Sequence, residues 1–139
     1  MTPLTVGEVE HIAFRLAQEH LSFDEPIPDF TTRFPNILES CLLTPLQKFG
    51  GKYLYLTFTL KAAMLFYLMI KNHPFQNGNK RIAITTLLLF LKQNRKWLNA
   101  DSEEFYNFTK WIAASPADTK KQTVSAIEQF IKKNVIAYN

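Results

Sequence analysis

Two stretches of nearly uninterrupted apolar residues, Ala62–Ile70 and Ile82–Leu91, dominate the pattern of hydrophobic and polar positions. They lie within segments of helix-forming composition, so the pattern predicts helices over residues 58–71 and 80–96. Helices that are apolar on almost every side pack in the centre of a domain. Both stretches are well short of the about 20 apolar residues that cross a bilayer, so we expect no membrane span.

Capping signals predict further helices around this pair. A Thr, Asn, Asp or Ser before an amphipathic segment can accept hydrogen bonds from the first amide groups of a helix. The candidate caps are Thr5, Asn36, Asp101 and Ser115. The expected helices span residues 5–21, 37–43, 58–71, 80–96, 101–114 and 115–133. The predicted fold class is all-α, with about six helices in one compact domain over residues 1–139.

Two segments do not follow a helical pattern. Phe23–Pro35 contains three prolines, which predicts a loop. In Lys48–Thr57 a Gly50-Gly51 pair precedes aromatic and β-branched residues, which predicts a small β-hairpin. An irregular loop fits this segment equally well.

The single cysteine and the N-terminal residues indicate the compartment. Cys41 has no partner for an internal disulfide and lies in an apolar run, so we expect a buried, unreactive thiol and a reducing environment. Met1–Thr5 has neither the basic nor the apolar part of a secretory signal. These features predict a cytoplasmic protein.

Charge is distributed unevenly along the chain. Residues 1–39 hold two basic and seven acidic side chains, residues 40–100 nine basic and no acidic ones, and residues 101–139 five of each. The central part therefore carries a positive field that favours an anionic ligand, either a nucleotide phosphate or a nucleic acid. A solvated basic face has the same composition. No single helix collects enough basic residues to favour nucleic-acid recognition, so we do not expect a nucleic-acid partner.

Residues with catalytic or ligand-binding potential are concentrated in nine positions between the two central helices, His73–Arg81. Lys80 and Arg81 fall in the expected first turn of a helix, where cations are normally unfavourable by about 0.3–1 kcal/mol each. A bound phosphate would make the two cations favourable there, because the free amide groups and both cations then face one anion. Gly78 allows close approach of the backbone, and Asn79 can cap the helix or donate to a phosphate.

His73 adds a candidate general base to this run, because an imidazole titrates near neutrality. A histidine without such neighbours is more often a structural hydrogen-bonding residue, and we assign His11 and His20 to that class. The sequence contains no Walker-type loop, no nucleophile elbow and no zinc-protease helix motif. One cysteine and three scattered histidines do not make a structural zinc site.

The run resembles the signature of the Fic/Doc family, His-x-Phe-x-(Asp/Glu/Asn)-(Gly/Ala)-Asn-(Gly/Lys)-Arg. Lys80 stands where the Doc, or death-on-curing, branch has a lysine in place of a glycine. Further segments resemble the family in the same order along the chain: Arg33, Leu38–Ser40, Phe49–Gly51, Lys61–Ala63 and Asn72–Phe75. The resemblance covers about residues 4–133.

The resemblance implies a small helical fold and an enzyme that uses ATP. Fic enzymes usually transfer AMP to a protein hydroxyl, whereas the similar Doc branch transfers the γ-phosphate, with elongation factor Tu as the known type of target. It implies that His73 is the general base and that Phe75 anchors the loop in the core. The implied phosphate-binding residues are Gly78, Asn79, Lys80 and Arg81. The implied flap, which aligns the target segment, comprises Phe49, Gly50, Gly51, Lys52, Tyr53, Leu54 and Tyr55.

Two positions depart from the family pattern. Asn77 stands where an acidic magnesium ligand is usual, and a carboxamide oxygen is a weaker ligand for a hard cation. Dependence on Mg²⁺ is therefore open, and a catalytically weakened module that binds a nucleotide or a partner is an alternative. AMP transfer is the other alternative. Ile84 argues against it, because AMP-transferring members often have a second arginine there.

Regulation is implied by a motif that the sequence lacks. The self-inhibitory segment of the family, Ser/Thr-x-x-x-Glu-Gly/Asn, does not occur. Doc-like toxins are instead restrained by a separate antitoxin whose disordered tail folds onto the toxin. The resemblance therefore implies a toxin of a toxin–antitoxin module, with a protein substrate and a separate antitoxin chain as partners.

Overall fold

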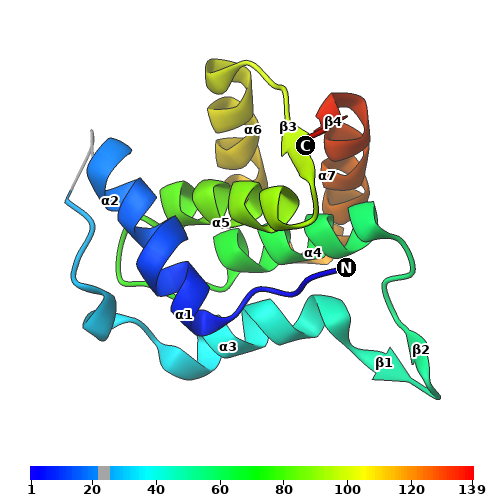
Figure 1. Ribbon diagram of the computed structural model, residues 1–139, viewed down its shortest axis with the longest axis horizontal. Helices are drawn as coiled ribbons and strands as arrows, with labels where there is room; N and C mark the ends of the chain where they lie inside the picture. The colour runs from blue at the N-terminus through cyan, green and yellow to red at the C-terminus, as the bar shows by residue number, and fades with distance from the viewer. Residues whose placement is uncertain (22–25) are drawn as a thin grey trace.

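The computed structural model describes residues 1–21 and 26–139, and its helices surround a central antiparallel pair (Figure 1). The helical segments are α1 (Val6–Glu8), a π-helical segment (Val9–Phe14), α2 (Arg15–His20), α3 (Pro35–Leu43), α4 (Phe58–Lys71), α5 (Asn79–Gln93), α6 (Ser102–Ala114) and α7 (Lys120–Asn134). Short 3-10 turns cover Phe30–Thr32, Thr44–Leu46 and Ala117–Thr119. Two antiparallel strand pairs are formed by β1 (Lys48–Phe49) with β2 (Lys52–Tyr53), and by β3 (Lys96–Leu98) with β4 (Val135–Ala137). This helical architecture with a small hairpin confirms the predicted fold class.

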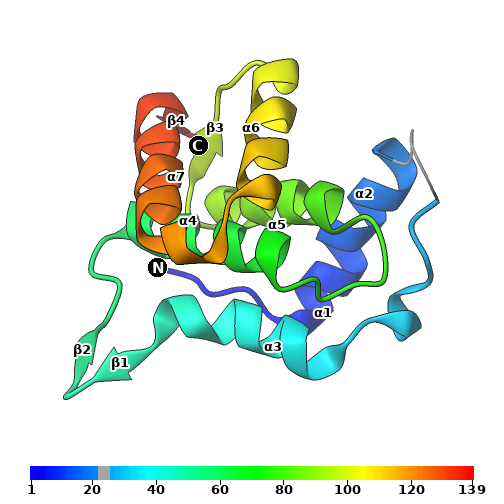
Figure 2. The same ribbon diagram turned by 180° about the vertical axis from the view of Figure 1, so that it is seen from behind.

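The central pair, α4 and α5, is covered by α3 and the N-terminal helix on one side and by α6 and α7 on the other (Figures 1 and 2). Ten successive residues of α4, Lys61–Ile70, are buried, as the apolar pattern predicts. The largest fully buried side chains come from the central pair and its neighbours: Leu38, Phe66, Met69, Ile70, Ile82, Leu87, Leu91, Ile112, Ile127 and Ile131. None of the helices described is long and apolar enough to cross a bilayer.

Of the four predicted caps, Thr5 and Asp101 match the structure, whereas Asn36 and Ser115 do not. Thr5 and Glu8 form the expected reciprocal capping box at the start of α1. Asp101 accepts a hydrogen bond from an amide in the first turn of α6. Asn36 does not cap α3, which begins one residue earlier at Pro35. The fixed φ of a proline suits the first helical position, where its missing N–H costs nothing.

Two other helices differ from the prediction. Ser115 ends α6 instead of capping the last helix, and a 3-10 turn precedes the start of α7 at Lys120. The helix over Val6–His20 ends close to the predicted residue, but its middle widens into the π-helical segment. There the Thr85 hydroxyl of α5 donates to the Ala13 carbonyl at 2.7 Å, which satisfies a backbone acceptor of the widened turn.

The Gly-Gly segment forms a hairpin and not an irregular loop. β1 and β2 pair in antiparallel register, and Gly50 and Gly51 connect them with φ values of 59° and 80°. Successive positive φ values match the right-handed twist of the flanking strands. Of the predicted loop Phe23–Pro35, residues 23–25 lie outside the described residues. The remainder is irregular up to α3 apart from the 3-10 turn at Phe30–Thr32.

The second small sheet, β3 with β4, was missed by the sequence prediction. α5 ends at Gln93, before the predicted end, because Asn94 closes the helix and Arg95 adopts a φ of 61°. The Trp97 and Tyr138 rings then lie together across the two strands, with centroids 5.9 Å apart. Strands of three residues contain too few alternations to produce a periodic signal.

Candidate functional site

His73 follows the C-terminal end of α4 in a conformation that is rare for a residue with a side chain. Its φ is 50°, in the left-handed region, and Pro74 comes next. The Asn72 amide makes the last helical bond, to the Leu68 carbonyl at 2.9 Å, so His73 occupies the position where helices often end on a left-handed residue. Such conformations persist only where surrounding contacts enforce them, and they cluster at functional sites.

The loop between α4 and α5 is anchored in the core by Phe75, which is buried. Its ring lies 5.4 Å from that of Phe14 and 5.9 Å from that of Phe30, measured between centroids. The Phe34 amide also donates to the Pro74 carbonyl at 2.9 Å. Contacts with the N-terminal helix and with the segment before α3 therefore fix the loop before α5 begins.

Asn79 closes this loop on itself. Its Oδ1 accepts from the Phe75 amide at 2.9 Å, and its Nδ2 donates to the Phe75 carbonyl at 2.8 Å. Nδ2 also lies 3.4 Å from His73 Nδ1. The side chain therefore shapes the loop and orients the imidazole, and it does not cap α5 as the sequence suggested. Asn79 is the first residue of α5, and its contact with a phosphate remains a prediction.

Gly78 is required for two separate reasons. Its φ of 77° lies in the left-handed region, and a Cβ there would approach Ile27 Cγ1 to 2.8 Å and Arg81 Nη2 to 3.4 Å. Gly78 precedes α5, which no side chain of a described residue caps. The amide groups of Asn79 and Lys80 thus open a helix of 15 residues, whose start carries a partial positive charge.

These groups surround a polar cavity of about 340 Å³. Its lining consists of Ile70, His73, Gln76, Asn77, Gly78, Asn79, Lys80, Arg81, Tyr106 and Ala113. The predicted base, the predicted phosphate-binding residues and Asn77 therefore lie together around one space. Among the described residues, the lining contains two cations and no carboxylate, which suits an anion. Its size falls within the range of small-molecule sites.

The two cations of the polar cavity differ in how they are held. Among the residues that the structure describes, Lys80 Nζ has no hydrogen-bond or ion-pair partner. Arg81 is only 5% exposed, and its Nη1 donates to the Leu21 carbonyl at the end of α2, at 3.0 Å. Lys80 can therefore turn toward a ligand, whereas Arg81 is fixed in the wall.

Asn77 is the one predicted metal ligand, and it lines the same cavity. Its Nδ2 donates to the Pro26 carbonyl at 3.5 Å, so Oδ1 is the atom with the chemistry to contact a cation. Within residues 1–21 and 26–139, no three His, Cys, Asp or Glu side chains gather to hold a metal ion. Because Mg²⁺ sites in proteins use one or two carboxylates with substrate phosphates, this donor set does not fit a magnesium ion held by the protein alone.

An apolar groove adjoins the polar cavity. It consists of two depressions of about 520 and 430 Å³ that share Leu16, Thr85 and Leu88. The larger depression is also lined by Arg81 and Tyr106, which line the polar cavity as well. Sequence analysis missed Tyr106, because it belongs to α6 and reaches the site only through tertiary packing.

The structure does not bring the predicted flap to the polar cavity. The β1–β2 hairpin lies at the N-terminal end of α4, on the side of the molecule opposite the α4–α5 loop in both views (Figures 1 and 2). Because α4 has 14 residues, it separates the two by about 20 Å. None of the residues in Phe49–Tyr55 lines the cavity, and their contact with a target remains a prediction.

Comparison with known proteins gives one match. A family model described as the Fic/DOC family matches residues 3–91, which include the hairpin and the α4–α5 loop. The expected resemblance of residues 92–133 lies beyond this match and remains a prediction. No curated protein and no solved structure matches the chain. The family generally transfers nucleotide-derived groups to proteins. Because the match spans well over half of the residues, the chain belongs to the Fic/DOC family.

Proposed function

We propose that this chain is a Doc-type toxin that transfers the γ-phosphate of ATP to a hydroxyl group of a target protein. The observation that carries the proposal is the polar cavity, in which His73 lies with Lys80, Arg81 and the uncapped start of α5. The two cations, the histidine and the start of α5 around one space support a phosphate substrate with a base beside it. Membership of the Fic/DOC family supports a transferase that acts on proteins.

In the proposed reaction the target hydroxyl attacks the γ-phosphorus and its proton passes to His73. A bond forms between the hydroxyl oxygen and the phosphorus, the bond from phosphorus to the β–γ bridging oxygen breaks, and ADP leaves. Lys80, Arg81 and the first amide groups of α5 stabilise the charge on the phosphate oxygens. The strained backbone of His73 supports a base that is already in position.

Two positions favour γ-phosphate transfer over AMP transfer. Lys80 lines the polar cavity at the position where the Doc branch has its lysine. Ile84, where AMP-transferring members often have a second arginine, lines the apolar groove and not the polar cavity. The cavity therefore offers the cation of the kinase branch and lacks the additional one of the AMP-transferring branch.

A second candidate function is a nucleotide- or partner-binding module without catalysis. Asn77 favours it, because the cavity has a neutral amide where the family usually has an acidic magnesium ligand. If this candidate is correct, Asn77→Asp raises transfer from none to a measurable rate.

We also propose a separate antitoxin chain as the regulatory partner. The apolar groove supports this proposal, because Ile12 and Leu16 line it and are each 42% exposed. An amphipathic helix in an apolar groove is a common mode of recognition. A helix there would lie beside Arg81, next to the phosphate-binding groups. The proposed target class, a translation elongation factor, rests on the family resemblance.

The proposed function is tested with ATP labelled at either the α or the γ phosphorus. The wild-type chain and His73→Ala are incubated with Mg²⁺, host lysate and each labelled ATP. Label from the γ position on a protein band, lost with His73→Ala, is the expected result. Label from the α position would assign AMP transfer, and no label on any band would favour the binding module.

A further inference from the structure

Lys61 is a buried cation far from the polar cavity. Of the described residues, only Lys61 and Arg81 are cations with buried side chains, each 5% exposed. Arg81 is explained by the polar cavity, but Lys61 lies in the first turns of α4, at the opposite end of that helix. Because burial of an ammonium group is costly unless its hydrogen bonds are satisfied, the partners of Lys61 indicate what it holds.

The partners of Lys61 all belong to the chain that leaves the hairpin. Nζ donates to the Tyr55 carbonyl at 2.6 Å and to the Leu56 carbonyl at 3.4 Å. It also lies 4.2 Å from the centroid of the Tyr53 ring, where a cation is attracted to the ring face. No carboxylate in the described part of the chain forms an ion pair with Lys61. Among the described residues, the charge of Lys61 is thus satisfied by the hairpin and the segment that follows it.

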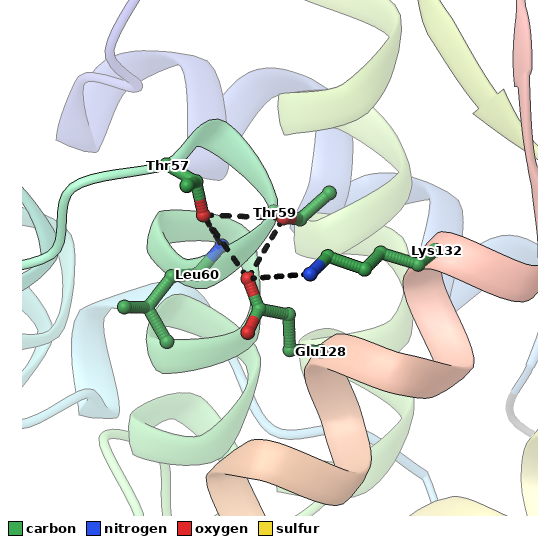
Figure 3. A network of polar contacts seen from close by, with 5 residues as sticks. All are labelled: Thr57, Thr59, Leu60, Glu128 and Lys132. Carbon is green, nitrogen blue, oxygen red and sulfur yellow. Dashed lines mark hydrogen bonds and ion pairs between the residues drawn. The ribbon is translucent and has the colours of Figure 1, made fainter.

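The residue that follows these carbonyls is fixed as well (Figure 3). Thr57 caps α4 by accepting from the Leu60 amide at 3.1 Å. Glu128 of α7 accepts from the hydroxyls of Thr57 and Thr59 at 3.0 and 2.8 Å, and it pairs with Lys132 at 3.7 Å. The segment between β2 and α4 is therefore held to α4 by Lys61 and to α7 by Glu128.

The outer side chains of the same segment remain in solvent. Phe49 is 81% exposed at the hairpin turn, and Leu54 and Leu56 are 51% and 74% exposed. Large apolar side chains on a firmly held backbone are a feature of binding surfaces, because less conformational entropy is lost when a partner binds. The Lys61 contacts to Tyr55 and Leu56 fix the backbone that presents these side chains.

We propose that Lys61 is a positioning residue that holds the hairpin in the conformation that binds the protein substrate. The proposal rests on the proposed function and adds to it a residue that lines no part of the polar cavity. The length of α4, about 20 Å, keeps Lys61 from the reacting atoms, so its loss affects the binding of the protein and not the chemical step.

The test compares the wild type with Lys61→Met, Lys61→Arg and the exposed control Lys121→Met. Transfer from γ-labelled ATP is measured at increasing concentrations of host lysate protein. Lys61→Met is expected to raise the half-saturating lysate concentration about tenfold, the size of one lost hydrogen bond to a charged group, with an unchanged plateau. Lys61→Arg restores the wild-type curve, and Lys121→Met follows it. A Lys61→Met curve equal to that of the wild type, or one lowered only in its plateau, overturns the proposal.

Amide hydrogen exchange gives a second readout that does not depend on activity. The Leu54 amide donates to the Gln47 carbonyl at 3.0 Å and so reports closure of the hairpin. Lys61→Met is expected to speed its exchange at least about tenfold while the amides of α5 keep their protection. Unchanged exchange at Leu54 overturns the proposal. If Lys61→Met does not fold, Lys61→Gln replaces it in both measurements. Absence of label with the wild-type chain overturns the proposed function and, with it, the substrate-binding role of Lys61.

Discussion

Each end of α4 has a lysine that donates hydrogen bonds to backbone carbonyls of a neighbouring segment. At the N-terminal end, Lys61 donates to two backbone carbonyls of the segment that leaves the hairpin. At the C-terminal end, Lys71 donates to two carbonyls in the last turn and cap of α6, at 3.1 and 2.6 Å. Both lysines join α4 to a neighbouring segment without an ion pair among the described residues. The ends differ in what they join: an exposed hairpin at one, and a wall of the polar cavity at the other.

The backbone shows the same difference. In the hairpin, positive φ angles occur only at Gly50 and Gly51, and a Cβ on either would meet nothing within 4 Å. At the cavity, a positive φ falls on His73, which has a side chain, and on Gly78, where a Cβ would collide with Ile27. Strain and close packing are therefore concentrated at the cavity, where reacting groups need fixed positions. At the hairpin turn, by contrast, the two glycines face open space.

The largest expected effect is on the rate of transfer, and it distinguishes the catalytic role of the cavity from the binding role of the hairpin. His73→Ala is expected to lower kcat about 10²–10⁴-fold, the usual contribution of a general base. Phe49→Ala is expected to raise the half-saturating concentration of lysate protein without lowering kcat, because the hairpin lies about 20 Å from the cavity. Initial rates with γ-labelled ATP measure both. A fall in kcat with Phe49→Ala would show that the hairpin closes over the site.

The next comparison concerns two glycines with nearly equal φ, Gly78 at 77° and Gly51 at 80°. Gly51→Ala is expected to cost about 1 kcal/mol of unfolding free energy, the strain of a left-handed alanine. Gly78→Ala is expected to cost about 2–4 kcal/mol, because the methyl group also collides with Ile27. Urea unfolding of the two variants measures the difference. Equal losses would mean that Ile27 moves aside freely.

Lys71→Met sharpens the contrast with Lys61. Its loss releases the end of α6, which carries Ala113 of the cavity wall. We expect kcat to fall about tenfold, because small displacements of a wall misplace reacting groups. The half-saturating concentration of lysate protein should stay as in the wild type, with Lys121→Met as the matched control. A change in that concentration alone would show that both lysines serve substrate binding.

The smallest expected effect is at Glu128, which links α7 to the start of α4. Glu128→Gln keeps an oxygen that accepts from Thr57 and Thr59 but removes the charge that pairs with Lys132. We expect a loss of about 0.5–1 kcal/mol in unfolding free energy, because Lys132 is half exposed and solvent screens the pair. Thermal unfolding at low and high salt checks this, since the loss should shrink as salt rises. A loss that does not depend on salt would identify the hydrogen bonds as the stabilising contacts.

The sequence was sufficient where one local pattern determines the structure. The apolar stretch gave α4 its observed bounds, because burial on all sides and helix propensity agree over those residues. The residues of the polar cavity could be named because most of them are consecutive, His73–Arg81, and one loop brings them together. The hairpin could be proposed from Gly50 and Gly51, since a two-residue turn has a local signature.

The sequence was insufficient where tertiary contacts decide. Tyr106 reaches the cavity from α6, and Arg81 donates to the carbonyl of Leu21. The spacing of residues in the sequence predicts neither contact. The predicted capping by Asn79 and Ser115 was wrong because each side chain can bond to several backbone groups, and packing selects which. The distance from the hairpin to the cavity could not be predicted either, because it depends on the direction in which α4 runs between them.

The position of Arg81 has a consequence for control of the site. Its guanidinium lies in the wall between the polar cavity and the apolar groove. A partner that shifts this side chain on filling the groove changes the affinity of the cavity for phosphate. Thermodynamic linkage then requires phosphate to change the affinity of the partner by the same factor. A partner of this kind and a phosphate ligand would then regulate each other's binding through one side chain.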